Sequence, residues 1–246
     1  YEIIINTTPV GMHPNEFDES LINFYNFPHC KTVIDLVYNP YRTRLLLDAE
    51  QFNIKAINGL YMLLMQAKKT EEILFNQLIP DELIDKTYQS VIKRHNNLVL
   101  IGMPTSGKTS IGQILAKKLN MKLIDTDQLI ESYAGIKISQ IFKLYGEYKF
   151  RKIEEEVYQS LVSECGRLIS TGGGVILNPK NIENLKHQGI LIFIDKDLDL
   201  LKENDTLSRP LINDKSDFDK LFEERYNLYK EASDVTIHIS KDKQFT

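Results

Sequence analysis

The stretch Asn97-Leu98-Val99-Leu100-Ile101-Gly102-Met103-Pro104-Thr105-Ser106-Gly107-Lys108-Thr109 decides the fold. Residues 102–109 fit the pattern G-x-x-x-x-G-K-[ST], a glycine-rich loop whose backbone N–H groups surround phosphate oxygens. The apolar residues 97–101 before it predict a buried strand. Residues 111–119 after it predict an amphipathic helix, with one apolar face formed by Ile111, Ile114, Leu115 and Leu119. A strand, a phosphate loop and a helix N-terminus in this order predict a nucleotide-binding P-loop.

Composition limits the remaining possibilities. The chain has 246 residues, 42% of them hydrophobic, which is typical of a globular protein with one or two domains. Its net charge of −4 indicates no general attraction to nucleic acid or to an anionic membrane. No apolar run approaches the roughly 20 residues of a membrane-spanning helix. Cys30 and Cys165 match no metal-site spacing, so we expect a cytoplasmic protein in a reducing compartment.

Strands and helices alternate along the chain, which predicts an α/β protein with parallel strands and right-handed crossovers. In the first part we expect strands at 1–5, 32–37 and 55–57 and helices at 42–52, 59–78 and 81–95. We place a boundary near Lys93–Asn96, which gives one domain over 1–94 and a second over 95–246. The chain starts at Tyr1 with no visible signal peptide, and we expect it to be cut from a longer polypeptide.

Polar residues at strand ends predict the phosphate and metal chemistry. Lys108 is expected to reach the β- and γ-phosphates of a nucleotide, and the Thr109 hydroxyl to hold Mg²⁺. The strand 122–124 ends in Asp125-Thr126-Asp127. We expect Asp125 on the metal side, through water, and Asp127 beside the attacking hydroxyl, as a base or as an orienting group. Helix N-capping is the competing explanation for Asp127. Other loop residues expected to contact the nucleotide are Gly102, Ser106, Gly107 and Ser110.

A glycine triplet and three arginines complete the candidate site. Gly172-Gly173-Gly174 follow the strand 167–170, and their successive N–H groups would suit a carboxylate or phosphate, unless they form only a tight turn. Arg151 lies in the stretch Gly146–Arg151, where we expect a helix to begin that runs to about Glu164. This arginine suits bidentate contact with a carboxylate, the alternative being a surface pair with Glu155. Arg209 lies in a polar stretch that predicts a lid over the phosphoryl group, or else a solvated loop. Arg225, on a late helix, is ambiguous by itself.

Taken together, these features resemble the shikimate kinase family over about residues 97–240. The P-loop, the Asp-x-Asp strand end, the Phe150-Arg151 helix start, the glycine triplet, the Arg209-Pro210-Leu211 lid and the Arg225-x-x-Leu228-Tyr229 helix occur in the family's order. The resemblance implies a P-loop NTPase, nucleoside-monophosphate-kinase-like three-layer fold with a five-stranded parallel sheet. It implies transfer of phosphate from ATP, with Mg²⁺, to the 3-hydroxyl of shikimate in chorismate and aromatic amino acid biosynthesis.

The same resemblance implies roles for single residues. Shikimate would contact Asp127, Arg151, the glycine triplet and Arg225, while Lys108, Asp127 and Arg209 would be catalytic. The metal would be held by Thr109 and Asp125. Lys202 stands where the family usually has an arginine near the adenine, and it would bind the nucleotide less well. The kinase domain is expected to be monomeric.

Residues 1–75 resemble the C-terminal part of shikimate dehydrogenase, a partial Rossmann-like α/β segment. The resemblance rests on the stretches 5–12, 33–40 and 58–67. In that family the stretch Asn6–Met12 lies beside the nicotinamide, Tyr38 and Gln66 approach shikimate, and Gly59 approaches the cofactor. No G-x-G-x-x-[GA] loop precedes the segment and no substrate domain accompanies it, so we expect no dehydrogenase activity. For the whole chain, another small-molecule P-loop kinase and an inactive nucleotide-binding scaffold remain the alternatives to shikimate kinase.

Overall fold

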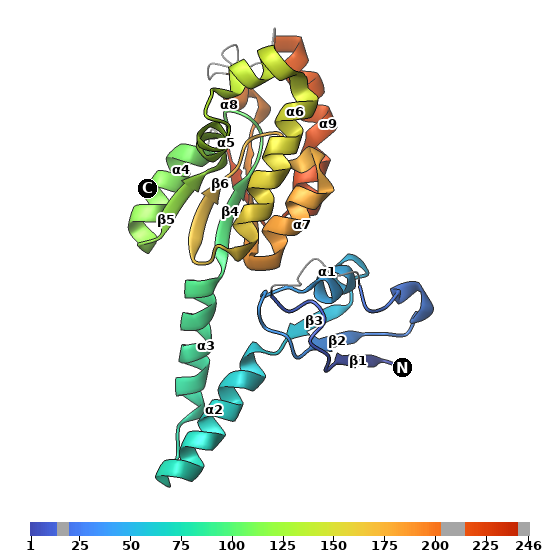
Figure 1. Ribbon diagram of the computed structural model, residues 1–246, viewed down its shortest axis with the longest axis vertical. Coiled ribbons are helices and arrows are strands. Elements are labelled where there is room, and N and C mark those ends of the chain that lie inside the picture. Colours follow the sequence, from blue (N-terminus) through green and yellow to red (C-terminus); the bar gives the residue numbers. More distant parts are fainter. Residues whose placement is uncertain (14–19, 203–214, 241–246) are drawn as a thin grey trace. The chain divides into compact units, whose positions relative to one another are not determined.

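Two compact units make up the chain (Figure 1). The computed structural model describes residues 1–13, 20–202 and 215–240. The first unit comprises Tyr1–Asn96 together with Lys186–Gln188, and the second comprises Asn97–Leu185 and Gly189–Thr246. Among the described residues, no helix is both long and apolar enough to cross a membrane.

The first unit contains a three-stranded parallel sheet, in the order β1 (Ile3–Asn6), β2 (Thr32–Asp35) and β3 (Lys55–Asn58). Helix α1 (Arg44–Gln51) packs on this sheet through a buried cluster that includes Val33, Leu46 and Ala49. The helix is shorter than the predicted 42–52. The Thr43 side chain lies before its first turn and accepts a hydrogen bond from the Leu46 N–H, which fixes the start of the helix.

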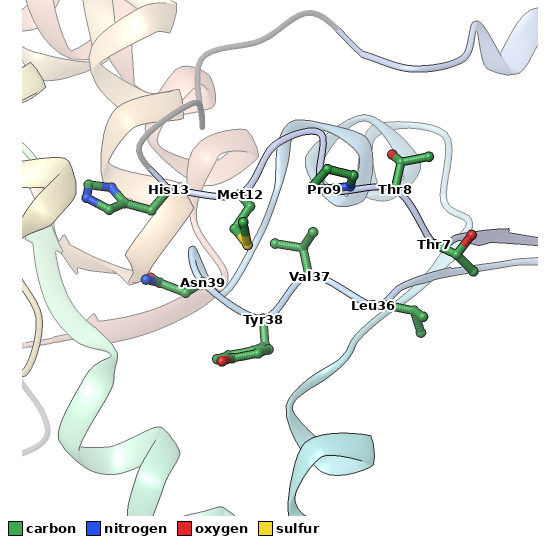
Figure 2. A pocket seen from close by; sticks show the side chains of 9 residues that line it. All are labelled: Thr7, Thr8, Pro9, Met12, His13, Leu36, Val37, Tyr38 and Asn39. Atoms are coloured by element: carbon green, nitrogen blue, oxygen red, sulfur yellow. The ribbon is translucent and has the colours of Figure 1, made fainter. Parts of the chain in front are cut away.

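Two longer helices and one cavity complete this unit. Helix α2 (Leu60–Phe75) ends before the predicted residue 78, because Asn76 adopts a left-handed backbone conformation with φ of 50°. Helix α3 (Asp81–His95) matches the predicted range, and the one-turn 3-10 helix η1 covers Phe24–Asn26. A cavity of about 370 Å³ opens between the segment after β1 and the segment after β2 (Figure 2). Its lining residues are Thr7, Thr8, Pro9, Met12, His13, Leu36, Val37, Tyr38 and Asn39.

The second unit is built on the predicted five-stranded parallel sheet, with the strand order β5-β6-β4-β7-β8. The strands are β4 (Asn97–Ile101), β5 (Lys122–Asp125), β6 (Arg167–Ser170), β7 (Gly189–Lys196) and β8 (Val235–Ile239). Central strand β4 is hydrogen-bonded to β6 on one side and β7 on the other. All pairs are parallel, so the carboxyl ends of β4, β5 and β6 lie at one edge, where ligands bind in such sheets.

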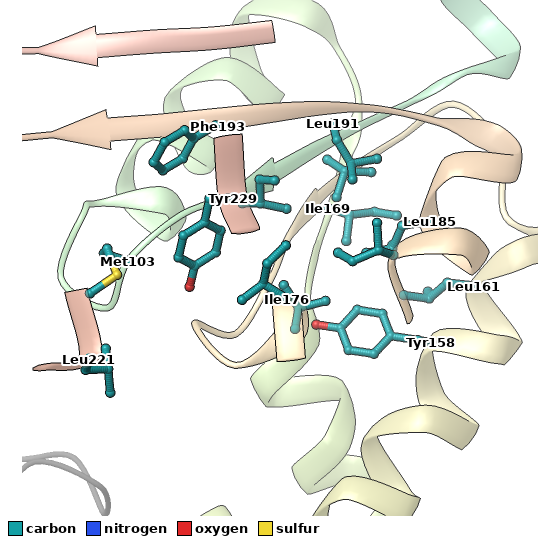
Figure 3. Packing of buried hydrophobic residues seen from close by; sticks show 14 of the residues in the cluster. Met103, Tyr158, Leu161, Ile169, Ile176, Leu185, Leu191, Phe193, Leu221 and Tyr229 are labelled. Carbon is teal, nitrogen blue, oxygen red and sulfur yellow. The ribbon is translucent and has the colours of Figure 1, made fainter. Parts of the chain in front are cut away.

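Helices cover both faces of this sheet. They are α4 (Lys108–Leu119), α5 (Thr126–Ala134), α6 (Ile138–Ser160), α7 (Pro179–Gln188), α8 (Leu198–Lys202) and α9 (Lys215–Ala232), with short 3-10 turns at Leu161–Ser163 and Val175–Leu177. One face forms the main core, where Val99, Ile169 and Phe193 pack against Tyr158 of α6 and Tyr229 of α9 (Figure 3).

Helix α4 differs from the sequence prediction in the residues that it buries. Ile114 was expected on the buried face of the helix after the P-loop, but it is 58% exposed. The buried positions of α4 are Lys108, Gly112 and Ala116. A Cβ atom on Gly112 would lie 3.1 Å from Leu123 Cδ1, so the helix approaches the sheet through small residues rather than through its large apolar ones.

The helix that carries Arg151 is longer than predicted. It was expected to begin near Gly146, whereas α6 begins at Ile138. Gly146 has φ of 76° and ψ of 175°, which are not helical values, so two helical segments meet at this residue. The predicted start therefore coincides with the break inside α6.

Candidate active site

The P-loop connects β4 to α4 and is held in shape by its own lysine. Gly107 has φ of 90°, a conformation that favours glycine, and α4 begins at the next residue. Lys108 Nζ donates hydrogen bonds of 2.8 Å to the carbonyl oxygens of Gly102 and Met103. The ammonium group therefore stabilises the loop from inside, at the position where the phosphates of a nucleotide would meet it.

A polar cavity of about 360 Å³ lies over the P-loop. Its lining residues are Thr105, Gly107, Lys108, Thr109, Ser110, Asp125, Asp127, Thr171, Gly173 and Lys196. Seven of these were predicted as site residues, and they come from the P-loop, the end of β5 and the loop after β6. The cavity therefore brings together the predicted phosphate loop, the paired aspartates and the middle glycine of the triplet.

Oxygen atoms gather on one side of this cavity. Thr109 Oγ1 donates to Asp125 Oδ2 at 2.9 Å and lies 3.3 Å from Ser170 Oγ. Asp125 Oδ1 accepts the N–H groups of Asp127 and Gln128, so Asp125 is the N-cap of α5. The capping alternative for Asp127 is thus wrong, because the helix already begins at Thr126 and its N-cap lies two residues before Asp127. The hydroxyl and carboxylate oxygens of Thr109 and Asp125 are the hard donors that Mg²⁺ prefers.

The glycine triplet is in close contact with three other parts of the site. A Cβ on Gly172 would lie 2.5 Å from Asp127 Oδ1, and one on Gly174 would lie 2.6 Å from Arg151 Nη1. A Cβ on Gly173 would lie 2.9 Å from Pro104 Cγ of the P-loop. Only glycine leaves room for these approaches. The triplet therefore brings the carboxylate of Asp127 and the guanidinium of Arg151 to its two ends.

One expectation about the triplet needs correction. Its successive N–H groups were predicted to face an anion, but the Gly172 N–H donates to Thr126 Oγ1 at 3.0 Å. The carbonyl oxygen of Gly173 also has partners within the fold: it accepts hydrogen bonds from Arg225 Nη1 at 3.0 Å and from the Tyr229 hydroxyl. The Gly172 N–H is therefore engaged within the fold rather than open to an anion, and the close contacts of the triplet make it a packed wall of the site.

Arg151 is held by two glutamates of its own helix. Its Nη1 lies 2.8 Å from Glu154 Oε2, and its Nη2 lies 3.0 Å from Glu147 Oε1. The alternative partner Glu155 is wrong, since Glu155 pairs with Lys180 at 3.0 Å. Burial alone would lower the pKa of Arg151, but the carboxylates of Glu154 and Glu147 outweigh it and raise that pKa. The guanidinium is therefore a permanent positive charge with a fixed orientation.

Glu154 is a site residue that sequence reasoning missed. It is only 2% exposed, and burial raises its pKa; the positive charge of Arg151 opposes this rise, and the negative charge of Asp127 adds to it. Its spacing of three residues from Arg151 on the same helix was the available signal. Lys196, at the end of β7, was also missed, because nothing in its local sequence indicates that it lines the P-loop cavity.

The remaining predicted residues lie in different settings. Ser106 is buried beneath the loop, with its hydroxyl 3.4 Å from Lys108 Nζ. Arg225 is 6% exposed and reaches the triplet from within the fold. Lys202 forms an ion pair with Asp219 of α9. Arg209 lies outside the described residues, so its lid role stays a prediction.

Comparison with known proteins agrees with this geometry. The sequence model of the family described as "Shikimate kinase" matches residues 104–245. The shikimate kinase of Clostridium botulinum (strain Eklund 17B / Type B) is 42% identical over 139 residues, which are 56% of this chain and 84% of that protein. The solved structure of shikimate kinase from Acinetobacter baumannii in complex with shikimate is 30% identical with a TM-score of 0.58, and the match covers 62% of this chain and 88% of that one.

A more partial likeness involves a second enzyme. Shikimate dehydrogenase 1 from Peptoclostridium difficile is 37% identical, with a TM-score of 0.34, over 37% of this chain and 33% of that one. This match is too small to support a conclusion about fold or activity. The family model, by contrast, spans more than half of the chain and includes the P-loop lysine, both aspartates, Arg151 and the glycine triplet. The chain therefore belongs to the shikimate kinase family.

Proposed function

We propose that this chain binds ATP and shikimate over the carboxyl ends of β4, β5 and β6. The reaction is the ATP-dependent phosphorylation of the 3-hydroxyl of shikimate. The observation that supports the proposed arrangement best is the glycine triplet, because it lies between Asp127 and Arg151 and borders the P-loop cavity through Gly173.

The nucleotide side uses the P-loop. Backbone N–H groups of residues 102–110 and the Lys108 ammonium would bind the phosphates, after Lys108 exchanges its carbonyl partners for phosphate oxygens. Thr109 and Asp125 would hold Mg²⁺, Asp125 through water, and the ion would neutralise charge on the phosphates. Lys196 adds a second positive charge to the same cavity. Contact between Lys202 and the nucleotide would require its pair with Asp219 to open.

The acceptor side uses complementary charges. The carboxylate of shikimate would be bound by the Arg151 guanidinium, which Glu147 and Glu154 orient. Asp127, which borders the P-loop cavity, would accept a hydrogen bond from the 3-hydroxyl and direct it toward the γ-phosphate. Arg225 would join the carboxylate contact if its guanidinium turns from the Gly173 carbonyl oxygen. Arg209 would supply the lid charge.

We assign residues 95–246 to the kinase domain and 1–94 to a segment of a shikimate dehydrogenase, as part of a multifunctional protein. The support for this segment is its set of sequence stretches and the cavity between residues 7–13 and 36–39, which includes Tyr38 (Figure 2). We propose that the segment is inactive in this chain, that the kinase domain is monomeric and cytoplasmic, and that neither nucleic acid nor a membrane is a partner.

The decisive experiment measures ADP release with ATP and Mg²⁺, in the presence and absence of shikimate. We expect turnover to require shikimate, and we expect the product to be shikimate 3-phosphate. Preference for another hydroxylated acid would favour the other small-molecule kinases, and acceptor-independent hydrolysis alone would favour the inactive scaffold. In the same assay Arg151→Ala should weaken shikimate binding and leave the KM for ATP unchanged. An unchanged affinity for shikimate would refute the proposed acceptor site.

A further inference from the structure

Two buried hydroxyl groups hold the first glycine of the triplet. Thr126, the first residue of α5, is 0% exposed, and its Oγ1 accepts the Gly172 N–H at 3.0 Å. The hydroxyl of Tyr158 lies 3.1 Å from the same oxygen, and Tyr158 is also 0% exposed. The two side chains therefore form a continuous hydrogen-bonded connection from α6 through α5 to the backbone of Gly172.

The position of Tyr158 on its helix relates this connection to the substrate site. Residues 151, 154 and 158 are three, four and seven positions apart, so they share one face of α6. Arg151 on this face lies against Gly174, and the Tyr158 hydroxyl interacts with Thr126 and with the backbone of Gly172. One helix face thus contacts both ends of the triplet. Figure 3 shows the Tyr158 ring packed in the core beside Ile176, with Leu161 and Leu185 nearby.

Gly172 in turn limits where the Asp127 carboxylate can lie. A Cβ on Gly172 would be only 2.5 Å from Asp127 Oδ1, so the carboxylate occupies the space that a side chain at this position would need. Asp127 also follows Thr126 directly in α5. A shift of Gly172 by a few tenths of an ångström would therefore change the position of Asp127 with respect to Arg151.

The charge state of the phenol suits this role. Burial raises the pKa of Tyr158 well above its ordinary value, and the negative charges of Glu154 and Asp127 raise it further. The phenol therefore keeps its proton and makes a neutral hydrogen bond with Thr126. The phenol of Tyr158 therefore adds no negative charge beside the carboxylates of Glu154 and Asp127.

We propose that Tyr158 and Thr126 are positioning residues for shikimate binding: their hydroxyl groups hold Gly172 against the Asp127 carboxylate and thereby set its spacing from the Arg151 guanidinium. The inference rests on the proposed acceptor site. It concerns two residues that contact neither substrate in that proposal and that act through the backbone of the triplet.

The test compares shikimate affinity, the KM for ATP and the melting temperature among variants of the full chain. Tyr158→Phe keeps the ring and its packing but removes the hydroxyl, and it should weaken shikimate binding about 3- to 10-fold. Thr126→Val removes the acceptor of the Gly172 N–H and should weaken binding about 10-fold or more, whereas Thr126→Ser should bind within about 2-fold of wild type. The KM for ATP should not change in any of them.

A double variant provides a sharper criterion. Because both hydroxyls act on the same N–H group, the effects of Thr126→Val and Tyr158→Phe on shikimate binding should be non-additive: the loss in the double variant should differ from the product of the two single losses, and a simple product would contradict the connection. Tyr133→Phe is the matched control, since it removes an exposed hydroxyl that is 3.0 Å from Glu156 Oε2, and it should leave binding unchanged.

The outcomes separate this inference from the proposed acceptor site. If Arg151→Ala weakens shikimate binding while Tyr158→Phe only lowers the melting temperature and binds normally, the positioning role is wrong and the site stands. If Arg151→Ala also binds normally, the site itself is wrong. Should Thr126→Val fail to fold, Tyr158→Phe still decides the question, because it removes only the hydroxyl oxygen and keeps the packed ring.

Discussion

Substituting Gly174 by alanine tests the contact between the triplet and Arg151. The added Cβ would lie 2.6 Å from Nη1 and 3.0 Å from Nη2 of Arg151, whereas ordinary contact begins at 3.4 Å. The guanidinium must therefore move by about 0.8 Å, the difference between 3.4 and 2.6 Å. Misplacement of a positioning group by about 1 Å can cost about 100-fold in activity, so we expect kcat/KM for shikimate to fall about 10- to 100-fold.

The same substitution should have little effect on stability. Gly174 has φ of −97° and ψ of −4°, which alanine adopts without strain. The atoms in the way belong to the far end of a flexible side chain, which can move aside. Gly135→Ala is the control with the opposite expectation, because Gly135 has φ of 70° and no atom lies within 4 Å of its added Cβ. It should lower stability by roughly 1 kcal/mol and leave shikimate kinetics unchanged.

The assay couples ADP release to a spectroscopic signal over a range of shikimate concentrations at saturating ATP. Thermal unfolding of both variants and of the wild type supplies the stability comparison. A Gly174→Ala enzyme with a normal KM for shikimate, or one whose activity falls only in proportion to lost folded protein, would show that the Arg151 guanidinium does not need this position.

The remaining predictions concern the P-loop, the buried glutamate and the first unit. Lys108→Ala should lower kcat by at least about 100-fold with an intact fold, because the lost contact is to the transferring phosphate; near-normal turnover would contradict it. Burial raises the pKa of Glu154 in the folded protein, so the folded protein binds a proton at this residue more readily than the unfolded chain does. As the pH rises from the ordinary pKa of glutamate toward the raised value, ionisation of Glu154 lowers the free energy of unfolding. Glu154→Gln should therefore gain stability relative to wild type with rising pH over this window, as melting temperatures at several pH values will show. The wild-type KM for shikimate should rise as the pH falls and Glu154 becomes neutral, while that of Glu154→Gln stays flat. Finally, the chain should not reduce NADP⁺ with shikimate, and a measurable rate at 340 nm would overturn that expectation.

Local sequence patterns carry most of the information about the fold. The P-loop pattern, the apolar strand before it and the alternation of strands and helices predicted an α/β fold with parallel strands, and the resemblance to shikimate kinases implied a sheet of five; the structure confirms both. Helix α3 was predicted with its observed ends, because Pro80 and the acidic first turn mark the start. The errors arose where packing overrides periodicity. Ile114 was assigned to the buried face of α4, but the sheet admits only small residues such as Gly112 there.

The sequence by itself indicated the groups that we propose for phosphate transfer: the P-loop lysine, the paired aspartates, the arginines and the glycines, which occur in short local patterns. Only the tertiary structure decided how these groups are supported. Thr126 and Tyr158 act on partners that are 32 and 46 positions away in the chain. Their roles depend on contacts between α5, α6 and the loop after β6. The physical reason is that a periodic pattern specifies which side of an element is buried, whereas a hydrogen bond between two elements depends on how they pack.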